Sequence, residues 1–102
     1  MRPRTIWKYP IPCLDCFELE IPSGGIFLSV QEQMGTPTAW FYVNPSMLTE
    51  KRRFHLIGTG HDIPEIIQEK RVVGGVELES YLGTVQLSPG HLVYHLFEEK
   101  NP

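Results

Sequence analysis

The chain has 102 residues and a formal net charge of −3, with 41% hydrophobic and 21% charged residues. This length suits a single domain over residues 1–102, and it leaves a thin core that association between copies would help to stabilise. The negative charge excludes a general nucleic-acid binder, which requires a basic face. No apolar run approaches the ~20 residues of a membrane span, and the basic N-terminus lacks the apolar segment of a secretory signal. We therefore expect a cytoplasmic protein that does not interact with membranes.

Nine prolines and nine glycines divide the chain into short segments, which is typical of an all-β protein. We expect about seven short strands, arranged as a small sandwich or barrel. In chain order they are Thr5–Tyr9 at a sheet edge, "CFELEIP" with Phe17, Leu19 and Ile21 inward, "GIFLSVQEQ" with Ile26, Leu28 and Val30 inward, "TAWFYVNP" in a central position, "RFHLIG", and a final hairpin of "SYLGTVQL" and "HLVYHLFEE" joined at "SPG". The stretch "NPSMLTEKR" is expected to be a polar loop, and "VVGGVELES" to contain a Gly-Gly turn.

One stretch, "DIPEIIQEKR", has helical character. Asp62 can cap a helix and Pro64 suits its first turn, while Ile63, Ile66 and Ile67 recur at helical spacing. These features predict one short helix near residues 62–71. The alternative is an irregular loop with buried isoleucines.

The tetrapeptide Gly58-Thr59-Gly60-His61 is the first candidate for a binding site. Its glycines allow positive φ and a close approach of the backbone to a ligand, and successive amides in such a turn can form an anion-binding nest. Arg52 and Arg53 lie just upstream, so we include both arginines among the candidate ligand-binding residues. The stretch is neither a Walker loop nor a dinucleotide fingerprint. The alternative is a tight turn after a strand.

The histidines and cysteines give weaker signals. His91 and His95 share a strand face but lie about 13 Å apart at ~3.3 Å per residue, so they cannot chelate one metal ion. His55 and His95 could be neighbours if their strands pair. Cys13 and Cys16 form one C-x-x-C pair without a second pair, and zinc requires three or four converging ligands. We expect reduced cysteines and no metal site or cofactor.

Catalytic patterns are absent from the sequence. There is no nucleophile elbow and no H-E-x-x-H motif, and Glu98 and Glu99 are typical of a solvated tail, so we do not expect an enzyme.

Trp40 and Tyr42 share one strand face. They are candidates for stacking on a nucleobase or for a subunit interface, with a place in the core as the alternative.

Several stretches along the chain also form a recognisable pattern: "IWKY", "EIPSGGIFLSVQEQMGTPTAW", "RRFHLIGTGHDI", "YLGTVQL" and "LVYHLFE". Together they resemble a family of small uncharacterised phage and prophage proteins that share W-K-Y, G-T-G-H, Y-x-G-T and L-V-x-H-x-F-E. The resemblance covers nearly the whole chain except Glu65–Glu79, and "CLDC" is not part of the pattern. It implies a phage-related accessory protein that acts in the host cytoplasm.

Three functional hypotheses follow. In the first, a homo-oligomer captures a small anionic ligand, such as a nucleotide signal of host defence, with the "GTGH" loop, Arg52, Arg53 and an aromatic wall. In the second, the protein binds a host protein and inhibits it through a strand edge or an apolar face. In the third, it is a minor structural component of the virion.

Overall fold

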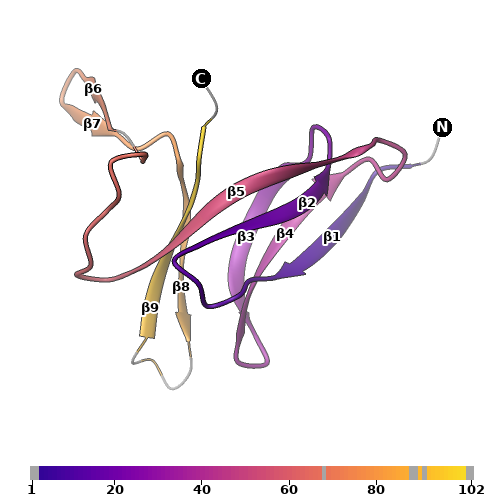
Figure 1. Ribbon diagram of the computed structural model, residues 1–102, viewed down its shortest axis with the longest axis horizontal. Coiled ribbons are helices and arrows are strands. Elements are labelled where there is room, and N and C mark those ends of the chain that lie inside the picture. Colours follow the sequence, from indigo (N-terminus) through magenta and orange to yellow (C-terminus); the bar gives the residue numbers. More distant parts are fainter. Residues whose placement is uncertain (1–2, 68, 88–89, 91, 101–102) are drawn as a thin grey trace.

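The computed structural model describes residues 3–67, 69–87, 90 and 92–100, and this part of the chain is all-β, as predicted (Figure 1). Its strands are β1 (Thr5–Pro10), β2 (Cys16–Pro22), β3 (Ile26–Gln33), β4 (Thr36–Val43), β5 (Thr49–Gly58), β6 (Lys70–Val72), β7 (Gly75–Glu77), β8 (Tyr81–Leu87) and β9 (Leu92–Glu98). They pair antiparallel in three sheets, ordered β1-β4-β3, β2-β5-β9-β8 and β6-β7.

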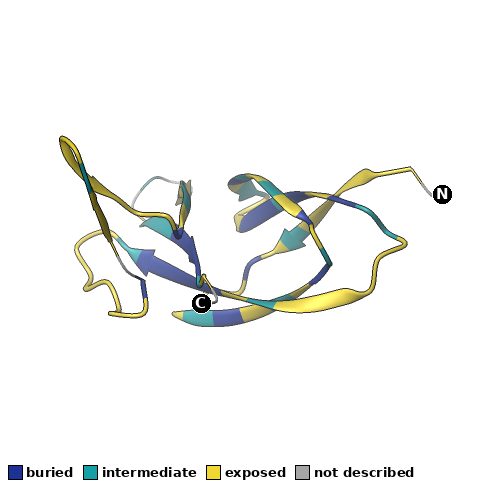
Figure 2. Cartoon of the chain, turned by 90° about the horizontal axis from the view of Figure 1, so that it is seen from above, coloured by how far each residue is buried: buried dark blue, intermediate teal, exposed yellow. Residues whose placement is uncertain are grey.

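The three-stranded and the four-stranded sheet enclose the core between them. Period-two alternation places one face of each strand inside, and buried segments occur on strands of both sheets (Figure 2). The buried cluster consists of Ile11, Phe17, Ile21, Val30, Ala39, Phe41, Val43, Phe54, Leu56, Val85, Leu87 and Leu96. At its centre the ring of Phe41 contacts Phe54 edge-on, with 6.1 Å between ring centroids. Strands β3 and β8 approach closely, since a Cβ atom on Gly83 would lie 3.0 Å from Cγ1 of Val30.

Several expected features are present. Strand β1 lies at a sheet edge and β4 lies in the centre of its sheet. The alternation of Phe17, Leu19 and Ile21 is also correct, because these residues of β2 face the core.

The expected inward face of β3 is wrong at Ile26 and Leu28, which are 57% and 48% exposed. The pairing with β4 shifts register between Phe27 and Ser29. An extra residue at such a bulge moves the following side chains to the other face. Phe27, which precedes the bulge, faces the core and packs against Phe41, at 5.6 Å between ring centroids, and Val30, which follows the bulge, is buried as expected.

The predicted helix near 62–71 is also wrong. The described residues of this segment form a turn and irregular backbone before β6 begins. The turn has one hydrogen bond, from the amide of Ile67 to the carbonyl of Pro64 at 3.0 Å. A few residues confined between two turns are too short to offset the cost of helix nucleation. Ile67 is buried whereas Ile63 and Ile66 are exposed. The alternative prediction, an irregular loop with buried isoleucines, is therefore correct for the backbone and for Ile67.

Two boundaries also differ from those expected. Strand β5 begins at Thr49, inside the expected polar loop, because its first residues pair with β2 as far as Pro22. The Gly-Gly turn joins the short strands β6 and β7, which the count of about seven did not include. Strands β8 and β9 pair as the expected hairpin, but Ser88 and Pro89 of the "SPG" turn lie outside the described residues.

Candidate ligand-binding site

The outer face of the four-stranded sheet is partly covered by the segment that follows β5. Phe54 and Leu56 of β5 belong to the core between the sheets, so the alternating residues His55 and Ile57 project to the outer face. Ile67 folds back onto this face and is buried with Ile57 and Phe97. The segment between β5 and Ile67 therefore forms a raised wall beside the open part of the sheet.

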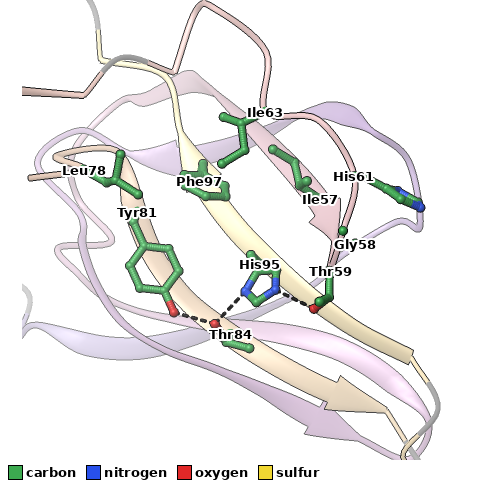
Figure 3. Close-up of a pocket in the computed structure, with 11 residues that line it drawn as sticks. Ile57, Gly58, Thr59, His61, Ile63, Leu78, Tyr81, Thr84, His95 and Phe97 are labelled. Carbon is green, nitrogen blue, oxygen red and sulfur yellow. Dashed lines mark hydrogen bonds between the residues drawn. The ribbon is translucent and has the colours of Figure 1, made fainter. Parts of the chain in front are cut away.

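A cavity of about 400 Å³ lies beside this wall (Figure 3). It is lined by Ile57, Gly58, Thr59, Gly60, His61, Ile63, Leu78, Tyr81, Thr84, His95 and Phe97. Most of its walls are aliphatic or aromatic, and the polar groups of two strands and of the loop after β5 converge on its floor. An apolar cleft of this size with a few placed polar groups is the usual form of a small-molecule site.

The polar groups of the floor form one hydrogen-bonded chain. The Tyr81 hydroxyl contacts Oγ1 of Thr84, which lies 2.8 Å from Nδ1 of His95. On the other side of the ring, Nε2 of His95 lies 2.8 Å from Oγ1 of Thr59 (Figure 3). This Tyr-Thr-His-Thr relay joins β8, β9 and the "GTGH" loop.

One set of proton positions satisfies the whole relay. Thr59 Oγ1 lies 3.5 Å from the carbonyl of Val93 and can donate to it. Thr59 then accepts from Nε2–H of His95, Nδ1 accepts from the Thr84 hydroxyl, and Thr84 accepts from Tyr81, since a hydroxyl both donates and accepts. With the other tautomer of His95 every donor and acceptor along the relay exchanges, so the Tyr81 hydroxyl can offer either an acceptor or a donor to a ligand in the cavity.

The "GTGH" loop shapes the cavity wall but does not form an anion nest. The amide of Thr59 donates to the Val93 carbonyl at 3.1 Å, and the amide of His61 donates to the Gly58 carbonyl at 3.1 Å. These amides are already used within the protein, so they do not converge on a ligand as a nest requires. Gly60 has φ +89°, which explains why glycine occupies this position of the turn.

Neither arginine reaches the cavity. Arg52 faces the core, where its guanidinium binds both carboxylate oxygens of Glu98 and the carbonyl of Gly25. Arg53 projects to the outer face and pairs with Glu99 at 2.7 Å. Thr59 lies six residues further along the chain than Arg53, about 20 Å at ~3.3 Å per residue. The structure therefore does not bring the arginines together with the loop.

Trp40 and Tyr42 lie in β4 of the other sheet, so they provide no wall for this cavity. Phe41 between them is in the core, and both residues face outward on the opposite side of the sandwich. Arg4 lies over the Tyr42 ring at 5.8 Å from its centroid.

Three of the relay residues were missed as binding residues. Tyr81, Thr84 and His95 come from the stretches "YLGTVQL" and "LVYHLFE", which predicted the final hairpin and carried the family resemblance, and His95 was considered only for metal binding. Tyr81 and Thr84 are three residues apart, so strict alternation would place them on opposite faces, and they share a face because the pairing of β8 with β9 shifts register between Tyr81 and Gly83. The polar residues of these strands therefore gave no periodic signal. They became informative only when pairing placed His95 opposite Thr84 on β8 and Ile57 on β5. His55 and His95 are not direct cross-strand partners, because His55 lies opposite Phe97, and His91 is outside the described residues.

Comparison with known proteins gives one match. A protein-family profile covers residues 2–102. The chain belongs to DUF7352, a domain of unknown function. No curated protein and no solved structure matches it. Membership of DUF7352 agrees with the expectation of an uncharacterised family.

In the described residues, no helix is both long and apolar enough to cross a bilayer.

Proposed function

We propose that the protein acts by binding a small, largely uncharged molecule in the cavity beside the "GTGH" loop. The main support for this proposal is the Tyr81–Thr84–His95–Thr59 relay on the floor of an otherwise apolar cavity of about 400 Å³. A relay of hydroxyls and imidazole offers directional hydrogen bonds without a fixed charge, which suits a planar group with both donors and acceptors.

The ligand class that fits best is a nucleobase or a similar heteroaromatic group. Tyr81 and Phe97 lie 5.5 Å apart, centroid to centroid, and supply aromatic surface along one side of the cavity. The described residues that line the cavity include no Arg, Lys, Asp or Glu. A nucleotide would therefore place its base in the cavity and leave its phosphate in solvent at the mouth. This proposal changes the first sequence hypothesis, in which the "GTGH" loop and the arginines recognise an anionic ligand.

The biological setting is proposed from the motif resemblance. A phage-type accessory protein that binds a nucleobase compound in the host cytoplasm could remove a nucleotide signal of host defence. The hydrogen-bonded floor supports the binding step of this proposal.

A thermal-shift screen tests the proposal with adenosine, guanosine, cytidine, uridine and inorganic phosphate as probes. We expect at least one nucleoside to raise the melting temperature and phosphate alone to have no effect. Tyr81→Phe removes one hydroxyl of the relay and keeps the ring. Because one hydrogen bond contributes about 0.5–1.5 kcal/mol, nucleoside affinity should fall about two- to tenfold.

The matched control is Tyr42→Phe, which deletes the same hydroxyl on the opposite side of the sandwich and should leave nucleoside affinity unchanged. Two outcomes would contradict the proposal. One is stabilisation by phosphate that survives Tyr81→Phe. The other is the failure of every nucleoside to bind at millimolar concentration.

A second proposal concerns the outer face of the three-stranded sheet. Ile6, Tyr42 and Ile26 occupy one register row across β1, β4 and β3, and all three are exposed. We propose that this row is the contact between two copies of the chain. A row of exposed apolar side chains can pair with itself about a two-fold axis, and a small domain with a thin core gains stability from such burial. A host protein or a virion component is the alternative occupant.

A further inference from the structure

Three side chains with metal-binding groups meet on the outer face of the four-stranded sheet, apart from the relay. Cys16 and His55 are direct cross-strand partners in β2 and β5. Glu99 follows β9, and its amide donates to the carbonyl of Arg53 at 2.9 Å, which fixes it beside the same part of β5. Residues far apart in sequence are thus held together by backbone pairing on both sides of β5.

The three groups have the chemistry and the spacing of a zinc site. Each side chain offers one ligand atom, a thiol sulfur, an imidazole nitrogen or a carboxylate oxygen, and these atoms all lie within 4.8 Å of one another. Zinc takes such ligands at about 2.0–2.3 Å in a tetrahedron, so the three atoms need only small side-chain adjustments. His55 is buried, and Cys16 and Glu99 are half-buried, so the ligands are already partly removed from water.

A second cavity leads to this cluster. It has a volume of about 320 Å³ and is lined by Asp15, Cys16, His55, Leu56, Ile57, His61, Asp62 and Pro64. His61 and Asp62 therefore line the same space as the thiol and the imidazole, and either residue or a water molecule can supply a fourth ligand. Three protein ligands beside an accessible space are the usual arrangement of an open zinc site.

Arg53 is a cation beside the cluster, and its geometry is compatible with a bound metal ion. Both Arg53 Nε and His55 Nε2 contact the same carboxylate oxygen, Glu99 Oε2, at 2.7 and 2.9 Å. Neither contact uses the other carboxylate oxygen of Glu99. The Arg53 side chain is 56% exposed, so it can turn towards solvent when a cation arrives.

We propose that Cys16, His55 and Glu99 bind one zinc ion. The binding releases the thiol proton, because zinc coordinates the thiolate. The C-x-x-C motif is not the unit that binds: Cys13 is exposed and does not belong to the cluster. The proposal gives a role to Cys16 alone, whereas the sequence led us to expect two reduced cysteines and no metal site.

The test uses the full chain, reduced and stripped with a chelator, with zinc as the added ligand. We expect isothermal titration to give one zinc ion per chain. Cys16→Ser should weaken binding by more than the roughly ten- to hundredfold that loss of an outer-shell partner costs. Cys13→Ser is the matched control, since it makes the same change three residues away and should bind like the wild type. Cobalt(II) provides a second readout, a thiolate-to-cobalt charge-transfer band that is absent in Cys16→Ser.

Several outcomes would overturn the proposal. One is a wild type that binds no zinc at micromolar concentration. Another is a Cys13→Ser variant that loses binding as fully as Cys16→Ser, which would assign the metal to the C-x-x-C pair. Glu99→Gln provides an independent variant that leaves β2 and β5 unchanged and removes a carboxylate from the partly exposed end of the cluster. Wild-type affinity in a folded Glu99→Gln would also contradict the proposed ligand set. Nucleoside binding is not involved in any of these measurements, so this proposal can fail while the proposed function stands.

Discussion

Arg52 binds the carboxylate of Glu98 through two nitrogens, Nε to Oε2 at 2.6 Å and Nη2 to Oε1 at 2.8 Å. A third nitrogen, Nη1, donates to the carbonyl of Gly25 at 2.6 Å, and the guanidinium lies over the ring of Phe41 at 5.2 Å from its centroid. The hydrogen bond with Glu98 is the main reason that the pKa of Arg52 is raised. An arginine that the sequence suggested for ligand binding thus has a structural role beside the core.

Removing the charge of Glu98 should destabilise the protein markedly. Glu98→Gln leaves a partly buried guanidinium without its anion, and breaking a buried pair costs about 3–5 kcal/mol. The side chains of Arg52 and Glu98 are 17% and 10% exposed, so water partly screens the charge that is left. We therefore expect the free energy of unfolding, measured in urea, to fall by about 2–4 kcal/mol. The control is Glu79→Gln, which breaks the exposed Lys70–Glu79 pair and should cost less than about 1 kcal/mol. Equal losses in both variants would refute the structural role.

Tyr9→Phe should stabilise the protein. The Tyr9 hydroxyl is buried without a hydrogen-bond partner among the described residues, and an unsatisfied buried polar group costs about 1–3 kcal/mol. Burial raises the pKa of Tyr9 above its usual 10.0, so the folded protein holds the phenol proton more tightly than the unfolded chain does. The stability that this shift contributes is present below pH 10 and is lost as the pH rises through the folded-state pKa. Urea unfolding at neutral and alkaline pH measures both effects. A less stable Tyr9→Phe at neutral pH would mean that the hydroxyl has a partner.

Gly25→Ala should destabilise the protein by overpacking. The added Cβ would lie 2.7 Å from Cγ2 of Ile21 and 3.2 Å from the Pro22 carbonyl oxygen. Overpacking of this kind costs about 1–3 kcal/mol. The neighbouring Gly24 has open space around it and φ +81°, a conformation that asparagine tolerates, so Gly24→Asn serves as the control and should cost less. A thermal melt in which Gly25→Ala equals the wild type would contradict the packing described here.

The outer face of the three-stranded sheet should determine the oligomeric state. We expect light scattering at micromolar concentration to give about twice the chain mass of 11.7 kDa. Ile26→Lys should give the monomer mass, because a charge in the apolar row is costly to bury. Val76→Lys changes an exposed apolar residue of β7 and should leave the dimer intact. A wild type that scatters as a monomer at every concentration would disprove self-association.

The alternation of apolar residues was sufficient to predict the strands of the core. Phe17, Leu19 and Ile21 obey period two, and so do Phe54 and Leu56, since burial on one face selects that pattern. It failed at Leu28 because a bulge depends on how β3 pairs with β4, and the sequence alone does not specify that pairing.

The candidate site was only partly predictable for the same reason. The glycines of "GTGH" indicated a turn that could lie against a ligand, and the loop does form one wall of the cavity. The floor depends on pairings that bring Thr84 beside His95 and Thr59 within 2.8 Å of the same ring. Arg52 and Arg53 are consecutive, so alternation sends one into the core and the other outward. Adjacency in sequence had suggested that they act together.

His61 lines both the cavity above the relay and the cavity beside Cys16. If each cavity has its own ligand, then a displacement of this one imidazole by the first ligand changes the space left for the second. Thermodynamic linkage requires the effect to be reciprocal: the factor by which zinc changes nucleoside affinity equals the factor by which the nucleoside changes zinc affinity. The short turn after β5 would then be a point of communication between two sites on one sheet.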